Sequence, residues 1–137
     1  MSELSKIIEA SCAFAEPSLK EMEEDKPWYY TRKGQSNILW SLLNVHRAIE
    51  RNLPYIRSIA IKDLNSNTVH SLPRPARHHD VIKWMRDRGV KCGEQGFTDN
   101  NGHFVDRETA FKIATKAGQI LDLNNTRGQS LFSEDLW

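Results

Sequence analysis

Apolar and polar positions along the chain follow two different periods, and the change between them predicts the first elements of the fold. Residues 37–51 repeat apolar side chains at three- and four-residue intervals, as one face of an amphipathic helix does. Residues 57–63 and 68–72 approach a two-residue alternation, and the turn residues 65–67 between them predict a hairpin. The helix is too apolar to stand alone, so we expect it to bury against the domain or against a second copy of the chain.

The second half of the chain predicts another helix and another hairpin. Residues 80–88 have the pattern of a helix that Asp80 caps and Gly89 ends. The Asn101-Gly102 pair is a strong tight-turn signal and predicts a hairpin between the strand-like residues on either side.

A last helix and a docked tail complete the predicted fold. Asp106 is expected to cap a helix that continues through Ala117, and Gly118 is expected to end it. Large apolar groups within residues 131–137 predict a tail that packs on the domain. The fold class is therefore α+β: two β-hairpins form a small antiparallel sheet packed by helices, with an extra N-terminal helical segment.

The chain divides into two parts that differ in charge. We expect residues 1–54 to be an N-terminal helical extension, with a short helix at 3–15, and residues 55–137 to be an α+β ligand-binding core that forms a single compact unit. Residues 1–25 carry seven acidic side chains against two lysines, a net charge of −5, whereas residues 26–137 carry 17 Lys and Arg against 11 Asp and Glu, a net charge of +6. A mildly basic body attracts small anions, but it lacks the dense cationic stripes typical of proteins that bind long nucleic acid.

Composition narrows the class of protein further. Apolar residues make up 39% of the 137 residues, which is enough for one core. No stretch approaches the roughly 20 consecutive apolar residues of a membrane helix, and the N-terminus lacks the basic start of a secretory signal. Cys12 and Cys92 have no metal-ligand spacing, and we expect them to be reduced thiols in a cytosol.

The densest polar cluster is Arg77-His78-His79-Asp80, where a proline-stiffened linker enters a predicted helix. The N-terminus of a helix favours anions, and arginine and histidine beside it would strengthen a phosphate contact. A His-His-Asp run also resembles part of a hydrolase metal site, although a metal needs further ligands from other elements. A solvated helix start is the third interpretation, and the sequence leaves all three open.

A second constellation surrounds the second hairpin. Phe97 offers a face on which a base stacks, Asp106 an acceptor for ribose hydroxyls, and Arg107 a cation for phosphate. The alternative is that Phe97 is core, Asp106 a cap and Arg107 a surface residue. Arg127, in a loop rich in turn residues, is a further candidate for an anion contact.

The chain has no nucleophile elbow, phosphate-binding loop, dinucleotide-binding glycine pattern or paired CxxC motif. Binding is therefore a better interpretation than catalysis. We assign no catalytic residue, no metal and no cofactor.

These motifs together resemble a known family. The combination of RHHD at 77–80, Gly96-Phe97, FVDR at 104–107, Gly118-Gln119 and SED at 133–135 is similar to the first type of Thoeris anti-defence proteins of bacteriophages. The resemblance covers roughly residues 57–137, and residues 1–54 have no counterpart in it.

The resemblance implies a sponge in the host cytoplasm. Such proteins bind cyclic ADP-ribose-type signals, glycocyclic ADP-ribose among them, and do not cleave them; some also hold cyclic oligonucleotides of the CBASS type in separate pockets of a hexamer. On this basis a cyclic nucleotide second messenger is the expected partner, and a homo-oligomer, a dimer or hexamer, is the expected assembly. The implied ligand-binding residues are Arg77, His78, His79, Phe97, Asp106, Arg107 and Arg127.

Two other functions remain as rivals. The first is a metal-dependent phosphodiesterase that uses His78, His79 and Asp80. The second is a module that binds a protein or a nucleic acid through the acidic front segment or the basic body.

Overall fold

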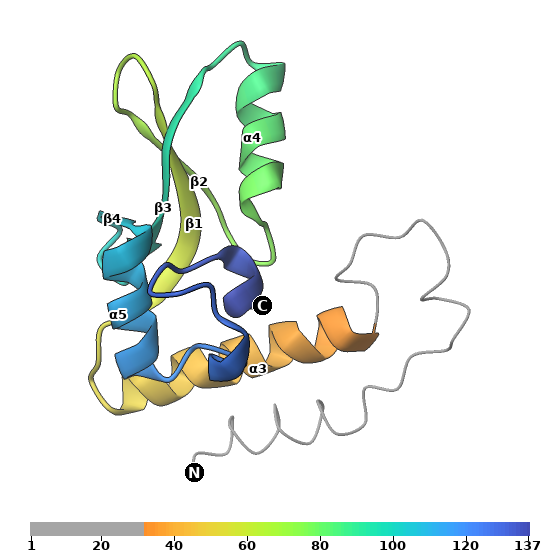
Figure 1. Cartoon of the computed structure of the whole chain (residues 1–137), viewed down its shortest axis with the longest axis vertical. Coiled ribbons are helices and arrows are strands. Elements are labelled where there is room, and N and C mark those ends of the chain that lie inside the picture. Colours follow the sequence, from red (N-terminus) through yellow and green to blue (C-terminus); the bar gives the residue numbers. More distant parts are fainter. Residues whose placement is uncertain (1–31) are drawn as a thin grey trace.

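The computed structural model describes residues 32–137, so the helix expected at 3–15 lies outside the described residues. Along the chain the elements are α3 (Arg32–Glu50), β1 (Ile56–Asp63), β2 (Val69–Leu72), α4 (His78–Asp87), β3 (Cys92–Asp99), β4 (Phe104–Asp106), α5 (Arg107–Ala117) and the short 3₁₀ helices η2 (Leu123–Asn125) and η3 (Ser133–Asp135). The strands form one antiparallel sheet in the order β2-β1-β3-β4. This confirms the predicted α+β class and both predicted hairpins (Figure 1).

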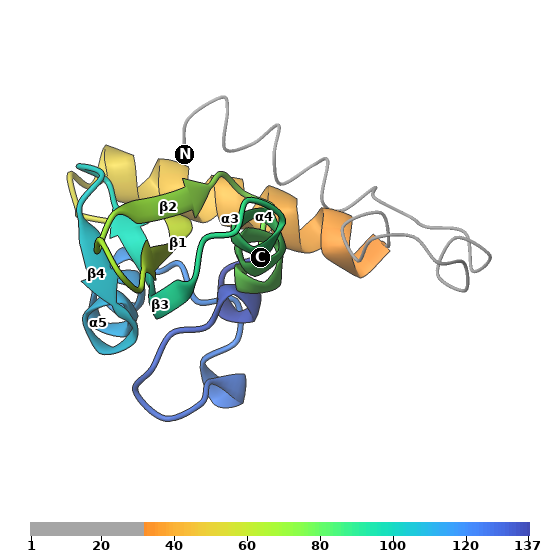
Figure 2. The same cartoon turned by 90° about the horizontal axis from the view of Figure 1, so that it is seen from above.

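One face of the sheet carries the hydrophobic core. Ile59 of the central strand β1 pairs with Leu72 on one side and with Phe97 on the other. Ile59 and Phe97 have no exposed surface, and they pack with Val81 and Met85 of α4. Helix α5 adds its alanines to the same cluster, while α3 runs across the lower end of the domain, as Figures 1 and 2 show.

The C-terminal tail docks into this core, as the sequence predicts. Leu131, Leu136 and Trp137 are fully or almost fully buried. The Trp137 indole Nε1 donates a hydrogen bond of 3.1 Å to the main-chain oxygen of Ala76, just before α4. The tail therefore runs from α5 to the start of α4 (Figure 1), where the Trp137 main-chain oxygen accepts a hydrogen bond from Arg77.

On the opposite face of the sheet, the Phe104 ring packs closely against Gly96. A Cβ atom at this position would lie 2.3 Å from the Val105 oxygen and 2.6 Å from Cζ of Phe104. The Phe104 ring thus occupies the space that a side chain would need, and Lys62 Nζ lies 4.4 Å from the centre of that ring. Glycine at position 96 is therefore a packing requirement of the sheet.

Two buried hydrogen bonds from one side chain fix the start of β1. Gln119, which follows α5 and is 3% exposed, accepts a bond of 2.7 Å from the Ile56 nitrogen and donates one of 2.9 Å to the Ile56 oxygen. Both main-chain groups of this first residue of β1 are therefore satisfied by one side chain.

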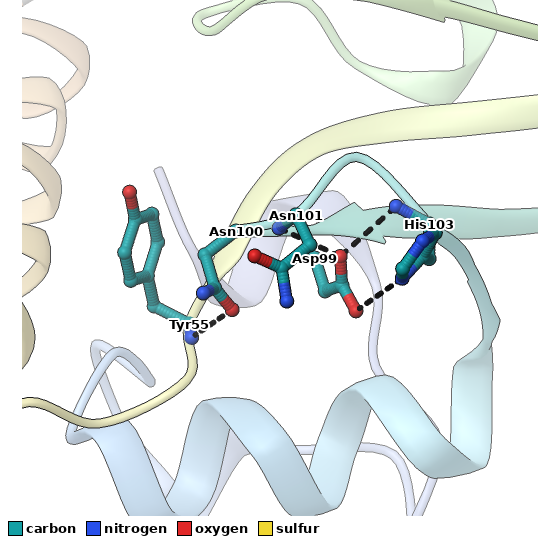
Figure 3. A network of polar contacts seen from close by, with 5 residues as sticks. All are labelled: Tyr55, Asp99, Asn100, Asn101 and His103. Carbon is teal, nitrogen blue, oxygen red and sulfur yellow. Dashed lines mark hydrogen bonds and ion pairs between the residues drawn. The ribbon is translucent and has the colours of Figure 1, made fainter.

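The turn between β3 and β4 is held by its own side chains (Figure 3). Oδ1 of Asp99 accepts bonds of 2.9 Å from the main-chain nitrogens of Asn101 and His103. Oδ1 of Asn100 accepts a longer bond of 3.4 Å from the Tyr55 nitrogen. The second hairpin is thereby tied to the chain that enters β1.

Helix α3 differs from the prediction in its start and in its buried face. Its described part begins at Arg32, not at residue 37, and its buried face includes small residues, Gly34, Ser41 and Ala48. Leu42 and Ile49 are 41% and 54% exposed. The expected burial of the whole apolar face is therefore confirmed only in part, because the helix lies on the domain along one side.

Helix α4 also begins earlier than predicted. Its first residue is His78, and Arg77 is the N-cap. The assignment of Asp80 as the cap was wrong: its Oδ2 instead accepts a bond of 2.8 Å from the Arg77 nitrogen, from the third position of the helix. The Asp80 carboxylate still accepts a bond from the main-chain nitrogen of the N-cap residue. The sequence therefore indicated a helix start correctly but placed its N-cap three residues too late.

Candidate functional site

Arg77 anchors a charged cluster at the point where the tail meets α4. Its Nη2 donates a hydrogen bond of 2.8 Å to the Trp137 main-chain oxygen, which fixes the guanidinium beside η3. Burial lowers the pKa of Arg77 from its ordinary value, and the charges of Glu134 and Asp80 act against that effect. A half-buried cation of this kind loses hydration, and a bound anion would restore part of the lost stabilisation.

Two further arginines converge on Phe132. Arg107, the first residue of α5, donates from Nη1 to the Leu131 oxygen at 2.8 Å and from Nη2 to Oε1 of Gln95 at 2.7 Å. Its guanidinium carbon lies 4.3 Å from the centre of the Phe132 ring, and that of Arg127 lies 4.6 Å away. Attraction between cations and an aromatic ring holds the loop around Arg127 against η3.

The acidic pair Glu134-Asp135 lies between these arginines. Oδ2 of Asp135 accepts a bond of 2.9 Å from the Phe132 nitrogen. Burial nevertheless raises the pKa of Asp135 above its ordinary value, against the effect of that bond and of the charges of Arg127 and Arg107. Glu134 is exposed, and its charge acts on Arg77 and Arg107.

These side chains border two cavities that share part of their lining. The larger cavity has a volume of about 510 Å³ and includes Arg77 in its wall. The smaller one, of about 230 Å³, includes Arg127 and Phe132. The residues common to both are Asn125, Glu134 and Asp135. The shared wall makes them two lobes of one site, which we call the arginine site, and the larger lobe has the size of a typical small-molecule pocket.

The structure brings together only some of the residues predicted from sequence. Arg77 lines the larger lobe and Arg127 the smaller one, and the Arg107 guanidinium contacts the Phe132 ring. Phe97 has no exposed surface, so it has no free face for a base, and its predicted stacking role was wrong. It lies in the hydrophobic core because β3 turns its side chain toward α4.

Asp106 lies away from the arginine site. Its Oδ1 accepts a bond of 2.7 Å from the Thr109 nitrogen, and this bond is the largest cause of its lowered pKa. It borders a separate, open depression with Arg107 and Ser130. The side chain therefore caps α5, which was the structural alternative for this residue, and it does not share a cavity with Arg77.

His78 has a structural role that the sequence did not reveal. Its Nε2 donates a hydrogen bond of 2.8 Å to the Gly96 oxygen, and its ring contacts Phe97 edge-on with centroids 5.0 Å apart. Burial lowers the pKa of His78 to about 4, so the ring is neutral at neutral pH. A neutral ring whose nitrogen is bonded to the main chain is not available as a phosphate contact.

His79 and Asp80 do not complete a metal centre with His78. Nε2 of His79 lies 3.4 Å from Oδ1 of Asp80, and the His79 side chain is 68% exposed. Among residues 32–137 there is no group of three or more His, Cys, Asp and Glu side chains arranged to hold a metal ion.

Sequence reasoning missed the other contributors to the arginine site. Asn125 and Phe132 come from the tail, and Lys33 and Asn37 from α3. None of these residues belongs to a sequence motif that indicates binding, so they are identified only by their positions around the cavity.

A small antiparallel sheet with helices on one face and a mixed-charge cavity beside the tail defines an α+β protein with a candidate ligand site. Residues 55–137, more than half of the chain, match the phage T4 y16D protein family, and the chain belongs to that family. The comparisons with curated proteins and with solved structures found no significant match. No helix within residues 32–137 has the length and apolar character needed to cross a membrane.

Proposed function

We propose that this protein binds and sequesters a small phosphate-bearing molecule of the cyclic-nucleotide class and leaves it chemically unchanged. The observation that carries the proposal is the arginine site, in which Arg77 and Arg127 line two lobes of one cavity around two carboxylates. The resemblance to the Thoeris anti-defence sponges and the membership of a phage family support this function.

The mixed charge of the arginine site suits a nucleotide better than a simple anion. Arg77 is held in place by the tail, so it meets a phosphate with little further loss of side-chain freedom. Glu134 and Asp135 would repel a bare phosphate, but they accept hydrogen bonds from ribose hydroxyls and from the amino groups of bases. A ligand that combines these groups satisfies both kinds of lining residue.

Binding is favoured over hydrolysis by the state of the histidine cluster. His78, one of the three residues of the metal-dependent alternative, is 7% exposed and packs edge-on against Phe97 of the core, so it does not face a cavity with His79 and Asp80. The remaining pair, His79 and Asp80, would supply two ligands from adjacent positions, fewer than the three protein ligands of a typical catalytic zinc site.

The test uses the full chain with cyclic ADP-ribose and a set of cyclic di- and trinucleotides. Calorimetric titration gives the affinity, and chromatography with mass spectrometry identifies the ligand recovered after the protein is denatured. We expect tight binding of at least one compound and its recovery unchanged, in the presence or absence of divalent metal ions.

A matched pair of variants locates the site. Arg77→Gln removes the cation in the larger lobe and should weaken binding by about 10- to 100-fold, the usual effect of losing one charge-assisted bond. Arg86→Gln removes an exposed arginine from α4 and should bind as the unmodified protein does. Failure of every compound to bind, equal behaviour of the two variants, or recovery of a cleaved ligand would overturn the proposal.

A further inference from the structure

Helix α3 lies outside the family match, which begins at residue 55, yet one of its faces forms a wall of the arginine site. Lys33, Gly34 and Asn37 line the larger lobe opposite the tail. The family core supplies the arginines, whereas this chain's own extension closes the cavity on the other side.

The same face of α3 continues past the arginine site into a second depression. Trp40 and Asn44 border a cavity of about 380 Å³ together with residues that follow α5. Asn37 and Leu121 line both this cavity and the larger lobe. The two spaces therefore form one groove between α3 and residues 118–125.

The spacing of the α3 residues explains why they share the groove. Positions 33, 37, 40 and 44 are separated by four, three and four residues, which places their side chains on one face of a helix. This face reads cation, amide, aromatic ring, amide. Trp40 is 37% exposed, and the Arg47 guanidinium carbon lies 6.0 Å from the centre of its ring.

We propose that this α3 face is the base-recognition half of the nucleotide site, with Trp40 as the stacking residue. The inference rests on the proposed function. Lys33 meets a second phosphate, Asn37 and Asn44 offer a donor and an acceptor each to a base edge, and the Trp40 ring stacks on the base. A nucleotide whose phosphate lies at Arg77 then extends along α3.

This assignment gives the aromatic role to a residue with an accessible ring. Phe97, the residue that sequence alone favoured, is fully enclosed by the core. Trp40 borders a cavity and keeps part of its surface in solvent, as a stacking platform must before its ligand arrives. The choice of base would consequently be a property of this chain's extension and not of the family core.

The experiment compares probes with and without a base. Cyclic di-AMP and cyclic ADP-ribose serve as base-bearing probes, and phosphoribosyl pyrophosphate serves as the probe that has ribose and phosphates but no base. Affinities are measured for the full chain and for four variants: Trp40→Ala, Trp40→Phe, Lys33→Gln and the control Ile49→Ala, which shortens an exposed side chain on α3 that does not line the groove.

Trp40→Ala should weaken the base-bearing probes by about 5- to 150-fold, the range measured for loss of one stacked base, and leave the binding of phosphoribosyl pyrophosphate unchanged. Trp40→Phe should retain most of the affinity, Lys33→Gln should weaken every probe, and Ile49→Ala should change none. If Trp40→Ala binds the base-bearing probes normally while Arg77→Gln does not, the inference is wrong and the proposed function stands. If the unmodified protein binds no probe, both are wrong.

Discussion

The buried histidine of α4 should make the stability of the fold depend on pH between about 4 and 6.5. The ordinary pKa of histidine, 6.5, applies to His78 in the unfolded chain, whereas burial lowers it to about 4 in the folded protein, an effect to which Arg107 and His79 contribute and which Glu134 and the bond to Gly96 oppose. As the pH falls below 6.5, His78 becomes protonated in the unfolded chain but stays neutral in the folded protein. The free energy of unfolding therefore falls with pH until the folded protein is protonated near pH 4.

The size of this effect follows from the two pKa values. At 1.36 kcal/mol for each pKa unit, the difference corresponds to about 3 kcal/mol, all of it present above pH 6.5 and all of it lost below pH 4. The free energy of unfolding of a typical domain is roughly 5–15 kcal/mol. The predicted change is therefore measurable in an ordinary unfolding experiment.

Urea unfolding followed by circular dichroism at several pH values between 7 and 4 tests the prediction. His78→Gln carries no titrating group, so its free energy of unfolding should lose about 3 kcal/mol less than that of the unmodified protein across this range. His103→Gln, at an exposed position of the β3–β4 turn that is not among the groups acting on His78, serves as the control and should keep the original pH dependence. Parallel curves for His78→Gln and the unmodified protein would refute the reasoning.

Two further predictions concern Gly96, which the sheet packs tightly, and Asp106, a predicted ligand contact that caps α5. Gly96→Ala should lower the free energy of unfolding by about 1–3 kcal/mol, because the new Cβ meets the Val105 oxygen and the Phe104 ring. Thermal unfolding measures this loss, and an unchanged midpoint would contradict the packing argument. Asp106→Ala should lower the free energy of unfolding by about 1 kcal/mol through loss of the bond from Thr109. Titration of the folded variant should show an unchanged affinity for cyclic nucleotides, and weakened binding would instead place Asp106 in the ligand site.

Local signals explain why so much of the fold is readable from the sequence. Asn101-Gly102 specifies a turn because Gly102 adopts a φ of 81°, which glycine reaches without strain. Asp106 and Gly118 mark the ends of α5 by the bonds that they make themselves, one through its side chain and the other through a left-handed main chain. Such residues act within a few positions of their own, so no knowledge of the rest of the chain is needed.

The candidate site was less readable because its residues meet only through the docking of the tail. The sequence offers Arg77 as a candidate anion contact from its place before a helix, but its neighbours Glu134 and Asn125 come from segments almost 50 or more residues away. The prediction for Phe97 failed for a related reason. An alternating strand specifies which residues share a face, but not which face the helices cover.

In the function that we propose, α3 and the family core would contact different parts of the same ligand. Phosphate is common to every nucleotide, and the residues that suit it, Arg77 and Arg127, belong to the part of the chain that matches the family. Bases differ from one signal to another, and the groups suited to distinguishing them, Asn37 and Trp40, lie on α3 outside that match. On this proposal, substitutions on α3 would change the selected base and leave the phosphate contacts of the core in place, because both parts line the groove.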